Sequence, residues 1–285
     1  MHTTQRAMHV HVDSQLATVK MSFSCLLLLP CCCLLLVASL ASGIPTPPSA
    51  SNSSLLWDYF LFVQQSPGGI CYFEVSHSSS CNNRTLNRKF SSQGGKNCEY
   101  ALNITNWTMH GIWATKYGTE GPNWCDESAK FVLEEIGELL PQMVSQWPNM
   151  KPETNFSSFW SHEWLKHGTC ASEIECMSSE KGFFSTVLAL HRTKMDFSAI
   201  LSRRGIFPSH NHTFKTADFN SAFESSTGVQ PLLECLYSAE AGQVLSQVSL
   251  CLKKDFTVMS CPDHVFNSTR HKCWDDEPIH YIPNF

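Results

Sequence analysis

The segment from Phe159 to Cys170 constrains this chain more than any other, because it concentrates acid–base side chains on one short element. It reads Phe-Trp-Ser-His-Glu-Trp-Leu-Lys-His-Gly-Thr-Cys, with two imidazoles, a carboxylate and an ammonium between His162 and His167. Glycine is a common helix terminator. We therefore expect a helix over residues 159–167 that ends at Gly168.

Helical geometry predicts which of these side chains point the same way. Residues four apart lie on one stripe, so Glu163 and His167 would share a stripe, with His162 and Lys166 on the adjacent one. A packed helix would then hold proton-transferring groups rigidly, as acid–base catalysis requires. Two other interpretations are a solvated helix face and a zinc site of the His-Glu-x-x-His type. The zinc pattern fits poorly, because His162 and His167 are five apart, which turns the imidazoles about 140° from each other. Lys166 would also repel a cation.

A second segment, Trp-Thr-Met-His-Gly-Ile-Trp at residues 107–113, alternates its bulky residues and is typical of a strand. Alternation would place His110 on the face opposite to Met109 and Gly111. Together the two segments resemble the active-site segments of the ribonuclease T2 family, a family of acid endoribonucleases. The resemblance extends from about Leu56 to Pro283. Residues 131–141 and 216–219 look most similar to animal members.

The resemblance implies an endoribonuclease that cleaves single-stranded RNA with no metal and no other cofactor. RNA carries its own nucleophile, so the enzyme needs a base for the 2′-hydroxyl proton and an acid for the leaving 5′-oxygen. By resemblance His167 is the base and His110 the acid, and the products are a 2′,3′-cyclic phosphate and a 5′-hydroxyl. Lys166 would stabilise the charge that builds on phosphorus. Glu163, either protonated or bridged to Lys166, would do the same or orient His167.

Four side chains are candidates for binding the substrate: His162, Trp113, Phe159 and Tyr117. His162 matches the family position that contacts phosphate, and the three aromatic rings could stack on bases. Trp113 and Phe159 could instead be core residues. The family usually has Trp-Pro-Asp where this chain has Trp-Ala-Thr at 113–115, so an acidic residue that accepts hydrogen bonds from a base is missing. Base preference therefore cannot be transferred.

The N-terminal region has the pattern of a secretory signal peptide. Residues 23–40 are almost wholly apolar and small residues follow, with a cleavage site expected near Ala41 or Gly43. The preceding polar stretch is long, so Met21 is an alternative start. An uncleaved anchor is the other interpretation, since about 18 apolar residues can just span a bilayer. We expect three regions: a signal peptide over 1–43, a disordered stem over 44–55 and a catalytic domain over 56–285.

Cysteines and sequons agree with export. Of the 14 cysteines, four lie in the signal peptide, and the remaining ten suit five disulfides in an oxidising compartment. The resemblance implies the pairs Cys71–Cys98, Cys125–Cys170, Cys235–Cys273 and Cys251–Cys261, which leaves Cys81 and Cys176 to pair by elimination. Asn-x-Ser/Thr sequons predict glycosylation at Asn52, Asn83, Asn103, Asn106, Asn155, Asn211 and Asn267. We expect a secreted protein, or one in the lumen of an acidic organelle such as the lysosome, without a stable membrane anchor.

The charge balance limits how the protein can meet RNA. The chain has 20 basic and 25 acidic residues, of which two and one lie before residue 44, so the mature net charge is −6. Such a surface does not favour a broad RNA footprint at neutral pH. Ten histidines remain after residue 43 and would add positive charge as the pH falls. We expect activity to peak at roughly pH 4.5–6.5. The same acidic balance, with the sequons, keeps open a secreted binding or signalling glycoprotein on a ribonuclease scaffold.

Helical and strand patterns occur in separate blocks along the chain. Strands are expected over 57–65, 107–113, 232–237, 244–252 and 256–261, and helices over 126–146, 159–167, 181–201 and 217–225. Blocks of this kind predict an α+β fold. We expect one monomeric domain with a central antiparallel β-sheet flanked by helices and stabilised by disulfides.

Overall fold

The computed structural model describes residues 56–77, 104–119, 121–150, 155–239, 241–268 and 272–284. The predicted signal peptide and stem, Cys81, Cys98 and the sequons at Asn52, Asn83 and Asn103 lie outside these residues. Within the described part of the chain, no helix is long and apolar enough to cross a bilayer.

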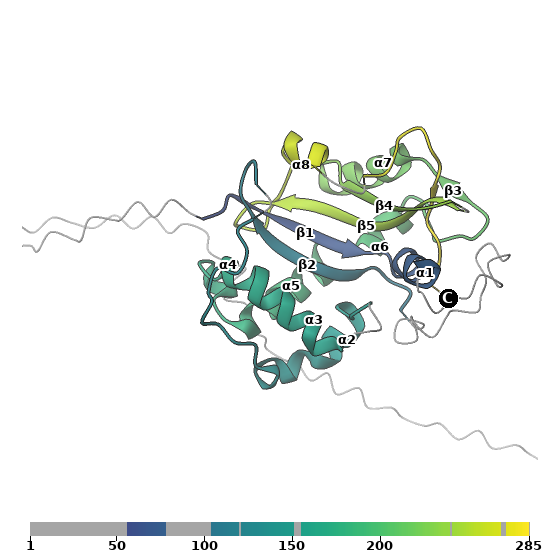
Figure 1. Ribbon diagram of the computed structural model, residues 1–285. Helices are drawn as coiled ribbons and strands as arrows, with labels where there is room; N and C mark the ends of the chain where they lie inside the picture. The colour runs from purple at the N-terminus through teal and green to yellow at the C-terminus, as the bar shows by residue number, and fades with distance from the viewer. Residues whose placement is uncertain are drawn as a thin grey trace, which may run out of the picture. The chain divides into compact units, whose positions relative to one another are not determined.

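One seven-stranded sheet forms the centre of the domain, in the order β2-β1-β5-β7-β3, with β4 and β6 also pairing with β5 (Figure 1). All pairs are antiparallel except β5 with β7. The predicted α+β fold with a central, largely antiparallel sheet is therefore confirmed. The strands are β1 (Tyr59–Gln65), β2 (Thr108–Thr115), β3 (Thr213–Phe214), β4 (Leu232–Ser238), β5 (Gly242–Leu252), β6 (Val258–Met259) and β7 (Ile279–His280).

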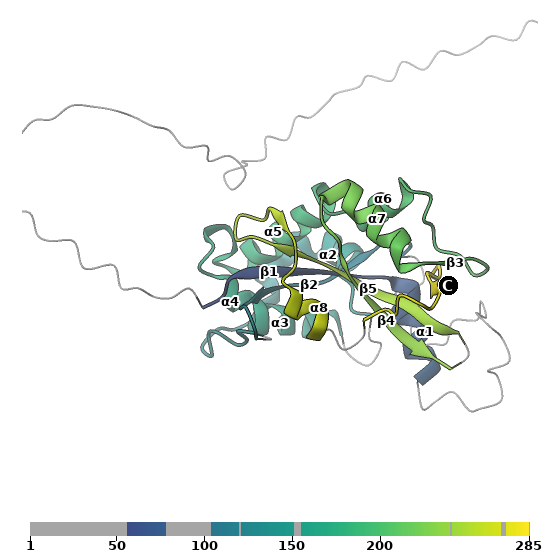
Figure 2. The ribbon, with the colours of Figure 1, turned by 90° about the horizontal axis from the view of Figure 1, so that it is seen from above.

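Helices cover the sheet, with α3 and α5 beside β2 and α7 and α8 toward β4 and β5 (Figures 1 and 2). The α-helices are α1 (Pro67–His77), α2 (Leu140–Gln146), α3 (Phe156–Glu163), α4 (Thr169–Ala171), α5 (Glu180–Thr193), α6 (Phe197–Ser202), α7 (Thr216–Thr227) and α8 (Asp263–Ser268). The described residues also include the 3₁₀ helices η2 (Leu133–Leu139) and η4 (Glu175–Met177) and the π-helix η3 (Trp164–Gly168).

The two faces of the sheet bury different clusters, because successive strand residues point to opposite faces. In β1, Phe60 and Phe62 belong to the main core cluster, which the helices beside β2 complete. Tyr59 and Leu61 belong to a smaller cluster on the other face, with Leu232 as a further member. The sheet is thus anchored on one face and leaves part of the other available for a site.

Several predicted helix boundaries differ from the structure. The helix expected over 181–201 is broken into α5 and α6, because the Asp196 side chain accepts a hydrogen bond from Ala199 N at 2.9 Å and starts a new helix. The helix expected over 126–146 begins only at Leu133, as a 3₁₀ turn. The Asp126 carboxylate instead holds a turn by accepting from the backbone of Ser128 at 2.9 Å.

Helix α1 directly follows β1 and is not among the predicted helices, because it begins with Pro-Gly-Gly at 67–69, a sequence typical of turns. Proline suits the first turn of a helix. The two glycines are needed for close packing: a Cβ at Gly68 would lie 2.3 Å from Ile282 O, and one at Gly69 would lie 1.9 Å from Leu245 O. These contacts are long-range, so local sequence could not reveal them.

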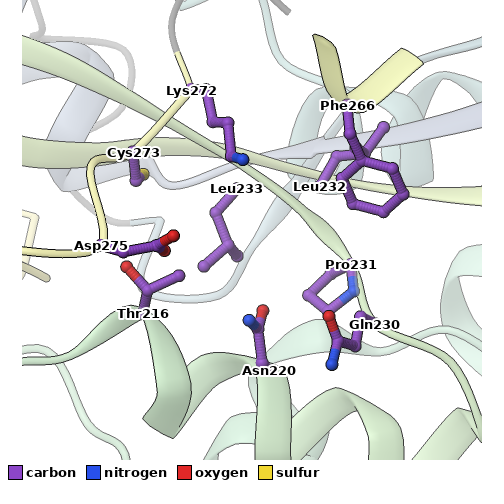
Figure 3. Close-up of a pocket in the computed structure, with 10 residues that line it drawn as sticks. All are labelled: Thr216, Asn220, Gln230, Pro231, Leu232, Leu233, Phe266, Lys272, Cys273 and Asp275. Carbon is purple, nitrogen blue, oxygen red and sulfur yellow. The ribbon is translucent and has the colours of Figure 1, made fainter. Parts of the chain in front are cut away.

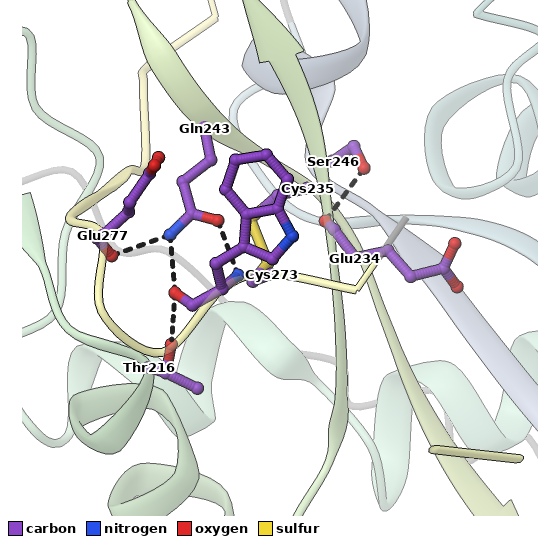
Figure 4. Close-up of a disulfide and its surroundings, with 8 residues drawn as sticks. Thr216, Glu234, Cys235, Gln243, Ser246, Cys273 and Glu277 are labelled. Atoms are coloured by element: carbon purple, nitrogen blue, oxygen red, sulfur yellow. Dashed lines mark hydrogen bonds between the residues drawn. A yellow bond between two sulfur atoms is a disulfide. The ribbon is translucent and has the colours of Figure 1, made fainter. Parts of the chain in front are cut away.

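The described disulfides confirm most of the predicted pairing. Cys125–Cys170, Cys235–Cys273 and Cys251–Cys261 are formed, and Figure 4 shows the second of them. Cys71 is also disulfide-bonded, while Cys98 lies outside the described residues. The pairing of Cys176 with Cys81 is corrected, because the Cys176 thiol is free. That side chain packs, partly buried, against the main core, as an unpaired cysteine commonly does.

Candidate active site

A β-bulge in β2 sets the direction of His110. Val63 of β1 pairs with Gly111 and Gln64 pairs with Met109, so His110 is the extra residue of the bulge. Met109 and Ile112 both belong to the main core cluster, which regular alternation would not allow. The bulge therefore places His110 opposite to Met109, as predicted, but on the same face as Gly111, contrary to the prediction. Bulges of this kind often re-aim side chains at active sites.

A π-helix positions the second histidine. The Thr169 amide bonds to Trp164 O, five residues back, so α3 widens into η3 and continues into α4. The prediction that Gly168 ends the helix is therefore wrong. Gly168 has a right-handed helical φ of −63°, and a Cβ there would lie 2.4 Å from the Trp164 ring. Its role is to allow close packing within the helix, and π-bulges are frequent at functional sites.

The Trp113 indole joins the two histidine segments. Its ring centroid lies 5.0 Å from that of His110 in an edge-on contact and 5.2 Å from that of His167 in a stacked contact. Its Nε1–H donates to Glu163 Oε2 at 3.0 Å. The strand and the helix thus meet through one aromatic ring, which brings His110, Glu163 and His167 together as the sequence predicted.

Gly111 makes this meeting possible. A Cβ on Gly111 would lie 2.2 Å from Glu163 Oε2 and 2.5 Å from Trp113 Nε1. No side chain larger than hydrogen can occupy this place without moving the carboxyl or the indole. The glycine of the first motif is therefore part of the site's geometry.

Burial controls the protonation of the two central groups. Burial raises the pKa of Glu163 to about 8, although the Trp113 hydrogen bond and the Lys166 charge oppose it. Burial also lowers the pKa of His167 to about 3, and the charges of Lys166, His162 and His110 act in the same direction. Near pH 5, therefore, the carboxyl is protonated and the His167 imidazole is neutral. A neutral imidazole is the form that can accept a proton.

His162, Glu163 and His167 lie closer together than helical geometry predicted. The rings of His162 and His167 have centroids 6.2 Å apart, because the π-turn brings residues five apart toward one another. One ligand-type atom from each of the three residues lies within 4.8 Å of the others. The geometry alone would therefore allow these three residues to share a metal ion. The 140° separation expected for His162 and His167 on a regular helix does not exclude a metal site here. The neighbouring Lys166 charge still disfavours a cation here.

An exposed tryptophan beside the helix was missed in the sequence. Trp124 is 50% exposed, and its ring meets His162 edge-on with centroids 5.7 Å apart. Its backbone has a φ of 56°, and its amide donates to Lys166 O at 2.9 Å. Cys125, the next residue, is bonded to Cys170. The ring is thus fixed beside the site, and the Cys125 spacing was the only sequence signal near it.

The other predicted substrate-binding residues divide into two groups. Phe159 lies by the site, with its ring centroid 6.0 Å from that of His110. Tyr117 is exposed, and its ring contacts are with Tyr59 at 5.2 Å and His264 at 6.2 Å. Its amide donates to Asp58 Oδ2 at 2.8 Å, so the loop folds back toward the start of β1. None of these described contacts of Tyr117 joins it to the two histidines.

A separate hollow lies between α7, β4 and the C-terminal segment (Figure 3). Its polar lining includes Asn220, Gln230, Lys272 and Asp275, beside the Phe266 ring. It shares no lining residue with the histidine cluster.

The model of the ribonuclease T2 family matches residues 57–261. Ribonuclease Oy of Magallana gigas is 33% identical over 230 residues, covering 80% of this chain and 97% of that protein. Human ribonuclease T2 is 40% identical over 161 residues, covering 55% of this chain and 60% of the human protein.

Solved structures show the same fold. The crystal structure of human RNase T2 has a TM-score of 0.63 and 30% identity, covering 80% of this chain and all of that one. The structure of RNase NT in complex with 5′-AMP has a TM-score of 0.59 and 27% identity, covering 80% of this chain and 98% of that one.

Proposed function

This chain belongs to the ribonuclease T2 family and is a metal-independent ribonuclease, and we propose that it cleaves single-stranded RNA by attack of the 2′-hydroxyl on the adjacent phosphorus. The products would be a 2′,3′-cyclic phosphate and a free 5′-hydroxyl. The observation that carries the proposal is the contact of both His110 and His167 with one Trp113 ring. Two imidazoles on separate elements can serve opposite sides of one phosphate.

His167 is the proposed base, and His110 the proposed acid. His167 is buried with a pKa of about 3, so it is neutral and able to accept the 2′-hydroxyl proton at the mildly acid pH expected. Its weak basicity limits the driving force, which a bound phosphate would increase by attracting the proton. His110 is less buried than His167 and would deliver its proton to the 5′-oxygen as the bond from phosphorus breaks.

Glu163 and Lys166 would stabilise the charge that builds on the phosphorus oxygens. Of the two forms expected for Glu163, burial favours the protonated carboxyl, which can donate a hydrogen bond to a phosphate oxygen. The ion pairs among the described residues are Lys181–Glu138 and Lys254–Glu173, and neither involves Glu163. Lys166 would supply the positive charge, with His162 as a further phosphate contact.

The proposed base-binding surface includes Phe159, whose ring lies 6.0 Å from that of His110, and Trp124, whose ring lies 5.7 Å from that of His162. Trp113 contacts both catalytic histidines. The Trp113 indole is hydrogen-bonded to Glu163 and stacks on His167. These contacts favour a structural role for Trp113 over base stacking. Thr115 stands where the family usually has an aspartate. Its hydroxyl donates to Trp113 O at 3.0 Å, so it does not replace the carboxylate that would accept hydrogen bonds from a base. Tyr117 remains a proposed outer contact for longer RNA.

Export and processing are part of the same proposal. A protein starting near residue 44, with its catalytic domain over 56–285, would act outside the cell or in an acidic organelle as a monomeric glycoprotein. The sequons at Asn106, Asn155 and Asn211 are exposed, which supports their use. The Asn155 side chain also accepts from Ser158 N at 2.8 Å as the cap of α3, a bond that leaves its amide nitrogen available. Mass measurement before and after glycan removal tests both the start and the occupied sites.

Activity of the histidine variants tests the proposal. The protein from residue 44 onward, with its disulfides intact, should cleave single-stranded RNA between pH 4 and 7. His110→Ala and His167→Ala should each lose at least about 100- to 10,000-fold in rate, with unchanged circular dichroism. Near-full activity in either variant would remove that histidine from the mechanism. The family match does not favour the binding or signalling alternative, but a double-histidine variant that keeps a cellular effect would support an additional role.

A further inference from the structure

The His110 imidazole is held from β5, two strands away from its own. Its Nδ1 is hydrogen-bonded to Oε1 of Gln247. The Gln247 Nε2 in turn donates to a carboxylate oxygen of Glu234 at 3.5 Å, a long contact. Gln247 and Glu234 are direct partners in the pairing of β5 with β4. A chain of three side chains therefore runs from the proposed acid to a carboxyl group that the mechanism does not use.

A second bulge builds this arrangement. Gln247 pairs with Glu234 and Leu245 pairs with Cys235, so Ser246 is an extra residue in β5. Leu245 and Val248 both belong to the main core cluster, so the bulge turns Ser246 and Gln247 together to the face that carries His110. The Ser246 hydroxyl donates to Glu234 O at 2.9 Å and bridges the bulge (Figure 4).

We propose that Gln247 is a positioning residue for the ribonuclease reaction, which keeps the His110 hydrogen on Nδ1 so that Nε2 carries out the proton transfer. This inference rests on the proposed function of His110. A glutamine oxygen can only accept, so contact with it requires a hydrogen on Nδ1 in both the neutral and the charged ring. Glu234 accepts from the amide nitrogen and thereby directs the amide oxygen toward His110. Burial raises the pKa of Glu234, but a carboxyl group can accept in either form.

A glutamine fixes the tautomer without adding charge beside the ring. A carboxylate in its place would stabilise the imidazolium and raise the pKa of His110. His167 faces His110 closely enough for the His110 charge to lower the pKa of His167. The Glu163 carboxyl lies beside Gly111, the residue next to His110, and Glu234 is linked to His110 through Gln247. The neutral amide therefore orients the ring of His110 without placing a negative charge against it.

Gln243 provides a matched control on the same strand. It is buried, and its amide donates to Trp274 O at 2.9 Å and Glu277 O at 2.7 Å, while its oxygen accepts from Trp274 N at 2.8 Å (Figure 4). None of these contacts is with the histidine cluster. Loss of this amide should weaken the fold without acting on His110.

The first test compares kinetics on a dinucleoside monophosphate. Gln247→Leu should lower kcat about 10- to 100-fold with KM within about twofold, because the substrate still binds but the acid is misaligned. Gln247→Glu should move the alkaline limb of the pH profile upward. Gln243→Leu should lower the melting temperature and keep the wild-type profile. A Gln247→Leu enzyme with wild-type kcat and profile would overturn the inference, as would the same losses in Gln243→Leu.

The second test reads the tautomer directly and does not depend on activity. Nitrogen-15 NMR of the His110 ring, assigned by its loss in His110→Ala, should show hydrogen on Nδ1 in the wild type. Gln247→Leu should shift the neutral ring toward hydrogen on Nε2, and Glu234→Ala should give a smaller shift. A wild-type ring with hydrogen on Nε2 would refute the positioning role. A protein that shows the Nδ1 tautomer but does not cleave RNA would instead refute the proposed function.

Discussion

Glu163→Gln should remove a large pH dependence of folding stability. The folded pKa of Glu163, about 8, lies above its ordinary value of 4.5. The stabilisation that comes from its protonated form is therefore fully present below about pH 4.5 and is lost as the pH rises through 8. At about 1.4 kcal/mol for each pH unit, the gap amounts to about 4 to 5 kcal/mol. The variant keeps an acceptor for the Trp113 indole but cannot ionise.

The measurement is urea unfolding at pH 5 and pH 8 with the disulfides intact. The wild type should lose up to about 4 kcal/mol more than Glu163→Gln between these two pH values. Glu138→Gln is the matched control, because Glu138 is exposed and its pKa is lowered by Lys181. The Glu138→Gln variant should therefore lose at least as much unfolding free energy between pH 5 and pH 8 as the wild type does. Equal pH dependence in the wild type and Glu163→Gln would show that Glu163 is not held protonated by burial.

Three further outcomes follow from the site. Gly111→Ala should destabilise the fold by about 1 to 3 kcal/mol and abolish most of the ribonuclease activity. Gly137→Ala is the control and should have neither effect, because no atom lies within 4 Å of a Cβ added there. Equal melting temperatures and cleavage rates for the two variants would refute the packing argument. Activity on RNA should persist in excess EDTA, and its abolition by chelation would point to a metal at the His-Glu-His group. Trp124→Ala should raise KM on an oligonucleotide. Trp274→Ala is the control, because Trp274 is similarly exposed, at 51%, and its loss should leave KM unchanged. An unchanged KM in Trp124→Ala would remove Trp124 from the substrate surface.

The side chains of the site could be named from the sequence, but their geometry could not. The two motifs identified His110, Glu163 and His167, and the structure brings all three around Trp113. The bulge at His110 depends on how β2 pairs with β1, and pairing is a long-range property. Simple alternation therefore put His110 and Gly111 on opposite faces.

The helix shows the same limit. Glycine propensity predicted an end at Gly168, but contact with Trp164 decides its role, and the π-turn then changes which side chains meet. Gln247 carries no local signal at all, since it reaches His110 across a neighbouring strand. The two motifs, through their resemblance to a known family, indicated the chemistry of this site, whereas packing between distant segments determined its shape.

In the proposed mechanism the RNA itself supplies the nucleophile, and the identity of the first product tests this most directly. A dinucleoside monophosphate should be incubated with the protein at pH 5 and followed by phosphorus-31 NMR. We predict that a 2′,3′-cyclic phosphate appears first, and that the same substrate with a 2′-deoxy group at the scissile position stays intact. A linear monophosphate as the first product, or cleavage of the deoxy substrate at a comparable rate, would contradict the account.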